Sequence, residues 1–89
     1  MTAQAKPQEV AASLLSDLRK CAVNNGFCKV EFGSMTLQYA TIGGVQKLRM
    51  NDRPETYDFA WRRLAQWCLS NPEKAKIQSD NLAALAARP

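Results

Sequence analysis

The 89-residue sequence contains no histidine, which excludes the commonest general base and every Ser-His or Cys-His nucleophile arrangement. Its three cysteines, Cys21, Cys28 and Cys68, include no C-x-x-C pair. Zinc sites usually need four Cys or His ligands, and disulfide frameworks belong to secreted chains. We therefore expect three buried free thiols, no bound metal and no cofactor.

Long apolar runs are also missing, so no transmembrane helix is expected. The N-terminal residues have no apolar core like that of a signal peptide, and we expect a cytoplasmic protein without membrane contact. Gly43-Gly44 lacks the helix and lysine that follow a phosphate-binding loop. The carboxylates of Asp52, Glu55 and Asp58 fall in the expected first turns of a helix, where the helix dipole accounts for them. No residue stands out as catalytic, and we expect a protein that is not an enzyme.

What is present is the composition of one small globular domain. The apolar fraction is 46% and the charged fraction 22%, both ordinary for a folded chain. Twelve basic and eight acidic residues give a net charge of +4, which permits contact with nucleic acid or an acidic protein surface without requiring either. The length allows one modest core.

Three short strands joined by two-residue turns are predicted over residues 27–50. The turns fall at Gly33-Ser34 and Gly43-Gly44, residue types that hairpin turns favour. Counting outward from both turns places the apolar residues together on one face, namely Cys28, Val30, Phe32, Met35, Leu37, Tyr39, Leu48 and Met50. The opposite face receives Lys29, Glu31, Thr36, Gln38, Lys47 and Arg49. Because a one-residue slip would mix the two sets, the pattern predicts the register.

A helix is predicted before these strands, over residues 7–23, after a flexible tail at residues 1–6. Two more helices are predicted after the strands. The order α-β-β-β-α-α indicates a single α+β domain at residues 7–89. Its three-stranded antiparallel meander is covered on one face by the helices and open on the other.

The second helix is expected to begin with Asp52 as N-cap and Glu55 at the capping-box position, and to end near Leu69. The third is expected to begin at Pro72. Its apolar stripe is poor, and we expect a kink or a break near residues 79–81.

The open sheet face carries three cations. Cross-strand pairing puts Lys29, Gln38 and Arg49 in one row and Lys47 in the next. A flat basic surface can follow phosphates, so this face is a candidate nucleic-acid interface. The interpretation we favour is an ordinary solvated sheet face, because single-strand binders stack bases on central aromatic residues and only Phe27, on an edge strand, is available.

A second candidate surface lies on the outer side of the second helix. Helical spacing turns Phe59, Arg62, Arg63 and Gln66 outward and puts Trp67 at the border. An aromatic residue beside two arginines is the composition of a protein-binding hot spot. The alternative is that the third helix folds back and buries Phe59. We favour a partner, because the third helix has few large apolar residues.

The order helix, three-stranded meander, helix over residues 8–69 resembles the double-stranded-RNA-binding domain. That family places a basic cluster at the start of its final helix, whereas Pro54, Glu55, Thr56, Tyr57 and Asp58 stand here and would repel phosphates. With a third helix added, the order also resembles small phage anti-CRISPR proteins. The known example is an acidic nucleic-acid mimic, whereas this chain is basic. The second resemblance implies a compact inhibitor or adaptor of a larger machine.

These patterns favour a small non-enzymatic protein-interaction module. We expect a regulator or inhibitor from a phage or mobile element that binds a larger host complex, as anti-CRISPR proteins do. The alternative is a nucleic-acid-binding module that uses the basic sheet face. The sequence leaves the partner and the oligomeric state open.

Overall fold

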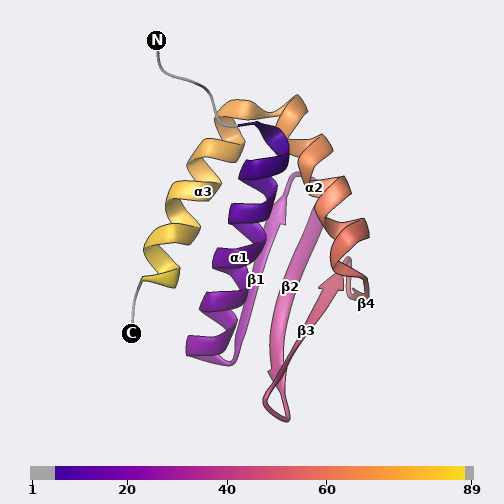
Figure 1. Ribbon diagram of the computed structural model, residues 1–89, viewed down its shortest axis with the longest axis vertical. Coiled ribbons are helices and arrows are strands. Elements are labelled where there is room, and N and C mark those ends of the chain that lie inside the picture. The colour runs from indigo at the N-terminus through magenta and orange to yellow at the C-terminus, as the bar shows by residue number, and fades with distance from the viewer. Residues whose placement is uncertain (1–5, 88–89) are drawn as a thin grey trace.

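A computed structural model describes residues 6–87 and has the predicted α+β class. The predicted tail at residues 1–6 lies outside the described residues except for Lys6, and α1 begins directly after it. In chain order the elements are α1 (Pro7–Asn25), β1 (Phe27–Phe32), β2 (Met35–Ile42), β3 (Val45–Met50), β4 (Arg53–Pro54), α2 (Tyr57–Ser70) and α3 (Pro72–Ala86). The helices form one layer over one face of an antiparallel sheet with strand order β1-β2-β3-β4 (Figure 1).

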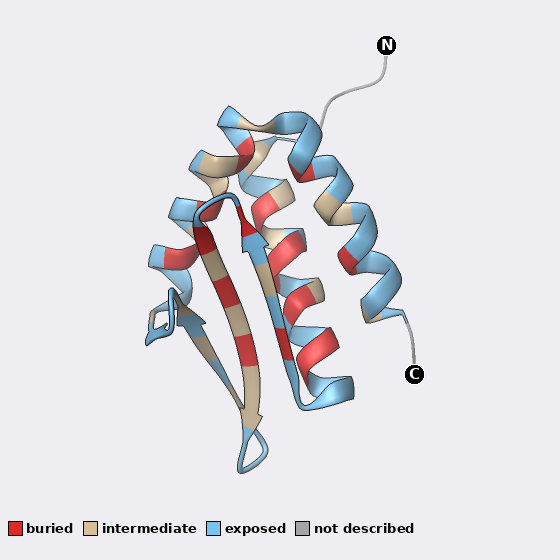
Figure 2. Ribbon diagram, turned by 180° about the vertical axis from the view of Figure 1, so that it is seen from behind, coloured by how far each residue is buried: buried red, intermediate tan, exposed pale blue. Residues whose placement is uncertain are grey.

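The three long strands pair in the predicted register. Leu37, in the middle of β2, stands opposite Val30 on one side and Met50 on the other. Buried and more exposed residues alternate along β2, as expected for a sheet with one covered face (Figure 2). The alternation and the two short turns were therefore enough to predict this part of the fold.

The predicted helix start at Asp52 is wrong, because Asn51 and Asp52 form a third tight turn. Their φ angles of 52° and 66° are both positive, as a type I′ hairpin turn requires, and Asn and Asp tolerate this conformation better than most residues. The Asn51 N–H donates to the carbonyl of Thr36 at 2.9 Å, and the Thr36 N–H donates to Asn51 Oδ1 at 2.9 Å. The chain then adds the short strand β4, which pairs with the end of β3.

α2 begins later than expected, with Thr56 as its N-cap. The Phe59 N–H donates to Thr56 Oγ1 at 3.3 Å, so the hydroxyl satisfies one of the free N–H groups of the first turn. The carboxylate of Glu55 instead accepts from the N–H of Thr56 at 3.0 Å. Helix capping therefore occurs four residues after the predicted position.

α1 is the centre of the core. It crosses the inner face of the sheet with α2 on one flank and α3 on the other (Figure 1). Its buried residues are Ala11, Leu14, Leu15, Leu18, Cys21 and Ala22. Burying one leucine side chain fully contributes about 1.5–3 kcal/mol, so this stripe is a large share of the stabilising burial in a domain of this size.

α3 is one continuous helix, and the predicted kink near residues 79–81 is wrong. Ala75 and Leu82 are buried on its inner side, where the helix packs along α1. Ile77 points away from them and is 60% exposed. The amide of Gln78 donates to the carbonyl of Glu31 at 3.0 Å, which ties α3 to β1 at the edge of the sheet. Packing on both sides of residues 79–81 therefore outweighs their weak helix propensity.

The three cysteines are free and buried, as predicted. Burial raises the pKa of the Cys28 thiol to about 12, and the neighbouring Cys21 thiol adds to the effect. Burial likewise raises the pKa of Cys68 to about 11. Both thiols are therefore protonated and unreactive at neutral pH. Within residues 6–87, no three metal-binding side chains gather at one place.

No helix in the described part of the chain is long and apolar enough to cross a membrane.

The central position of α1 gives a direct test of stability. We expect Leu18→Ala to lower the free energy of unfolding by about 2–5 kcal/mol, because the residue is fully buried and its removal leaves a cavity. Leu69→Ala, the same change at a side chain that is 69% exposed on α2, is expected to cost less than about 0.5 kcal/mol. Urea unfolding followed by circular dichroism measures both. Equal losses in the two variants would contradict this account of the core.

Candidate functional site

The outer side of α2 presents the predicted residues to solvent. Ala60, Leu64 and Cys68 are buried on the inner side of the helix. On the outer side, Phe59 is 41% exposed, and an arginine follows one turn later. We call the five predicted residues, Phe59, Arg62, Arg63, Gln66 and Trp67, the α2 surface.

α3 does not cover Phe59. α2 and α3 lie on opposite flanks of α1, and only their connection at Asn71 brings them together (Figure 1). The alternative in which the third helix buries Phe59 is therefore wrong. The α2 surface remains open along its length.

The structure adds a hollow at the end of this surface that the sequence did not reveal. The hollow has a volume of about 230 Å³ and lies between the second half of α2 and the β1–β2 turn. Its lining residues are Phe32, Ser34, Met35, Arg63, Gln66, Trp67, Ser70 and Asn71. We call it the α2–turn hollow. Three of the five predicted residues meet there, with Phe59 one helical turn before Arg63.

Arg62 is directed elsewhere. Its guanidinium lies 3.1 Å from the carboxylate of Asp58, one turn earlier on α2. Both side chains are exposed, so the ion pair contributes at most a few tenths of a kcal/mol. Arg62 does not line the hollow, so Arg63 is the charged residue among its lining side chains.

Trp67 forms the wall between the hollow and the core. Its ring meets Phe32 edge to face, with centroids 5.3 Å apart and an interplanar angle of 73°. The indole also rests on the β1–β2 turn, because a Cβ atom added at Gly33 would lie 3.0 Å from Trp67 Nε1. Only glycine leaves room for this approach while keeping the positive φ of 66° that the turn needs.

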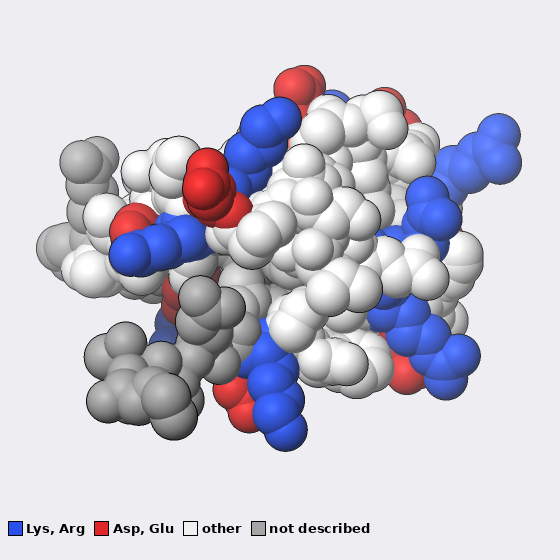
Figure 3. Space-filling view, turned by 90° about the horizontal axis from the view of Figure 1, so that it is seen from above, with Lys and Arg blue, Asp and Glu red and all other residues white. Residues whose placement is uncertain are grey.

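The polar side chains of the hollow carry hydroxyl, amide and guanidinium groups. Within residues 6–87, no hydrogen bond or ion pair engages the side chains of Ser34, Arg63, Gln66 or Ser70. The Asn71 amide is engaged, since it donates to the carbonyl of Trp67 at 3.1 Å. No carboxylate lines the hollow. Seen from this end of the molecule, the centre is uncharged, and Lys, Arg, Asp and Glu side chains lie around it (Figure 3).

A wider hollow of about 550 Å³ lies at the other end of α1. It spreads over the outer, convex side of that helix and reaches α3 at Ala86 and β3 at Gln46. Two of its polar side chains are already used: Arg19 donates to Gln46 Oε1 and Asn24 donates to the carbonyl of Ala86, both at 3.4 Å. Although this hollow is larger, more of its polar side chains are already hydrogen-bonded within the protein than in the α2–turn hollow.

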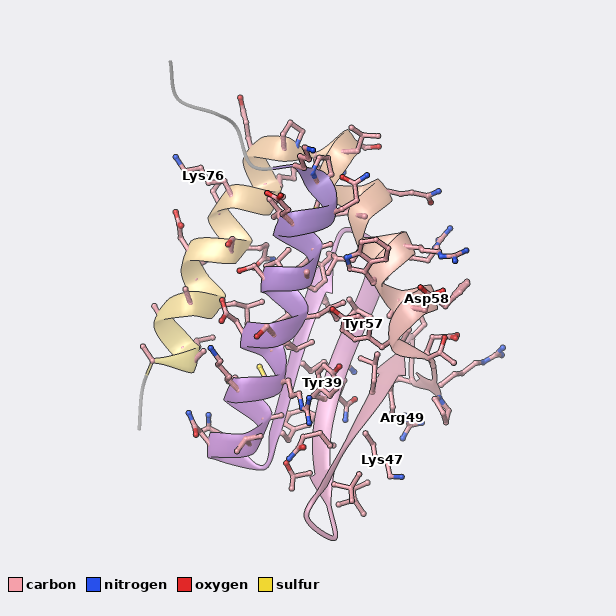
Figure 4. All side chains as sticks on the ribbon, viewed as in Figure 1. Tyr39, Lys47, Arg49, Tyr57, Asp58 and Lys76 are labelled. Carbon is pink, nitrogen blue, oxygen red and sulfur yellow. The ribbon has the colours of Figure 1, made fainter. Side chains whose placement is uncertain are left out.

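The basic sheet face forms in the predicted register but is partly neutralised. Lys29, Gln38 and Arg49 align in one row, and Lys47 follows opposite Ala40. Lys47 and Arg49 both project from β3 (Figure 4). Asp52, in the unpredicted turn, pairs with Lys29 at 3.4 Å, and its carbonyl accepts from the guanidinium of Arg49. Two of the three cations are therefore engaged within the protein.

Tyr57, the first residue of α2, is 51% exposed. It lies near Tyr39 on the covered side of the sheet (Figure 4). Burial raises the pKa of the Tyr39 hydroxyl, Arg19 lowers it and Tyr57 adds a small rise. Tyr57 is the first residue of α2, so no earlier turn of this helix shields its side chain from solvent.

No family model, curated protein or solved structure matches this chain. The function therefore has to be argued from the site itself.

The contact between the turn and Trp67 can be tested by a pair of alanine substitutions. We expect both Gly33→Ala and Gly43→Ala to be destabilising by about 1–2 kcal/mol, because both residues have positive φ angles, 66° and 60°. Gly33→Ala should cost more, since its new methyl group meets Trp67, whereas nothing lies within 4 Å of a Cβ at Gly43.

Urea unfolding and tryptophan emission in a Trp61→Phe background measure the two effects. Trp67 is then the only emitter, and its spectrum should change in the Gly33 variant alone. Equal destabilisation with unchanged emission would show that the indole does not rest on the turn.

Proposed function

We propose that this protein is a non-enzymatic protein-interaction module that binds its partner through the α2 surface. The observation that supports this most is the exposed Phe59 one turn before Arg63, which has no partner within residues 6–87 and lines the hollow walled by Trp67. Aromatic residues and arginine dominate the energetically important contacts of protein interfaces.

The rigidity of this surface supports the same proposal. Trp67 is held by Phe32 on one side and by the Gly33 turn on the other, so its ring needs little ordering when a partner binds. The helix fixes the spacing of Phe59 and Arg63, whose Cβ atoms lie about 5–6 Å apart at this separation. Binding therefore costs less conformational entropy than binding through a loop would.

The kind of protein that fits this surface is a compact regulator or inhibitor. We propose a cytoplasmic protein from a phage or mobile element that occupies a surface on a larger host complex, in the manner of anti-CRISPR proteins. The support is the small single domain, the α-β-β-β-α-α order and the net charge of +4, which favours an acidic partner surface.

Nucleic-acid binding through the sheet face is the second candidate. The aligned row of Lys29, Gln38 and Arg49, with Lys47 beside it, favours it. The contacts of Asp52 with Lys29 and Arg49 weigh against it, because the carboxylate pairs with Lys29 and the backbone carbonyl accepts from Arg49.

Partner capture with matched variants tests the first proposal. Tagged protein is used to capture binding partners from a lysate of the source cells, with and without nuclease. We expect Phe59→Ala, and Arg62→Ala combined with Arg63→Ala, to weaken capture by about 30-fold, the equivalent of roughly 2 kcal/mol at a hot spot. The melting temperature should change little, because these side chains are exposed.

Ile77→Ala is the control, since Ile77 is an apolar side chain on α3 that is 60% exposed and lies on the other flank of α1. It should leave capture unchanged. Loss of the partner with Ile77→Ala, or full retention with Phe59→Ala, would contradict the proposed interface. Loss on nuclease treatment would instead favour the nucleic-acid alternative.

A further inference from the structure

We infer that the α2–turn hollow receives an acidic side chain, Asp or Glu, of the partner protein. This inference rests on the proposed function, because it names the chemistry that the α2 surface recognises.

The hollow offers hydrogen-bond donors, one of them cationic, and no carboxylate. Arg63 supplies a guanidinium, Gln66 an amide, and Ser34 and Ser70 supply hydroxyl groups. Trp67 supplies an indole N–H that has no partner within residues 6–87. Because no fully buried side-chain nitrogen among those residues lacks a partner, this N–H must be reachable from solvent. An ionised carboxylate only accepts hydrogen bonds, so it can accept from each of these donors, and the guanidinium adds charge complementarity.

A single carboxylate fits better than a phosphate chain. Arg63 is the only cation among the lining residues, and the neighbouring Arg62 is paired with Asp58. A nucleic-acid backbone needs several cations at regular spacing, whereas one guanidinium can hold one carboxylate through two parallel hydrogen bonds.

The size of the hollow favours a side chain over a free ligand. Its volume of about 230 Å³ is below the range of about 300–1,000 Å³ that small-molecule sites occupy. Apolar surfaces of Phe32, Met35 and Trp67 form part of the wall, and they strengthen a charged hydrogen bond by excluding water. Phe59 stands one helical turn before Arg63, where it can contact an apolar residue of the same partner segment. We expect the recognised segment to contain both an acidic residue and an apolar one.

The two tryptophans provide a built-in reporter and control for the test. The chain has two tryptophans and hence two indole N–H resonances. The Trp61 indole donates to the carbonyl of Gln8 at 3.0 Å, and neither residue lines the hollow, whereas Trp67 does. Both can be followed in a ¹H–¹⁵N correlation spectrum of the labelled protein.

The probe is N-acetyl-glutamate α-amide, whose only carboxylate is the side chain. We expect a saturable shift of the Trp67 indole resonance, with a dissociation constant on the order of 1–10 mM for so small a ligand, and no shift of the Trp61 resonance. N-acetyl-glutamine α-amide, which has the same shape without the charge, should give no saturable shift. Arg63→Gln should weaken binding by at least about tenfold, because it removes the guanidinium.

Arg53→Gln is the control variant, since it removes the same charge from an exposed residue of β4, outside the α2 surface and the α2–turn hollow, and should leave binding unchanged. A Trp67 resonance that does not respond to the glutamate probe would overturn the inference. So would an equal response to the glutamine probe, to inorganic phosphate or to a short DNA duplex, or an equal effect of both arginine substitutions.

The two proposals fail in different ways. If partner capture depends on Phe59 but the glutamate probe does not bind, the interface stands and its assigned chemistry is wrong. If capture is indifferent to Phe59, the proposed function fails whatever the spectra show.

Discussion

The buried leucine stripe of α1 is the interaction on which the positions of the other elements depend. α1 takes the middle of the inner sheet face, so α2 and α3 pack on its two flanks. On one flank, Ala75 and Leu82 bury against α1 and keep α3 continuous. On the other, α2 buries its inner stripe and leaves its outer side uncovered. The open α2 surface is thus a direct consequence of how the core is packed.

Local patterns predicted the sheet well and the connection after it poorly. Alternation and two glycine-containing turns determine the register of β1, β2 and β3, because a slip would expose the apolar face. Asn51 and Asp52 resemble a helix start as much as a turn, since both residue types favour caps and tolerate positive φ. What decides between the two is the pairing of Asn51 with Thr36, fifteen positions earlier, and no local pattern contains it.

The candidate site divides in the same way. Helical spacing alone predicted that Phe59, Arg63 and Gln66 would face outward on α2. The hollow forms where the Gly33-Ser34 turn packs against the end of α2. In the sequence, this contact is reflected only in the glycine at position 33, because a side chain there would lie too close to Trp67. The neutralisation of the basic sheet face was missed because it depends on the turn that was mistaken for a helix start. Long-range contacts therefore account for each of these errors.

The central claim, that the α2 surface is where a partner sits, is tested most directly by site-specific photocrosslinking. A benzoylphenylalanine residue replaces Phe59 in one protein and Ile77 in another, and both are irradiated in a lysate of the source cells. The account predicts one dominant cross-linked protein from position 59 and none from position 77, with the cross-linked peptide containing an acidic residue. A cross-link from position 77 to the captured partner, with none from position 59, would contradict it.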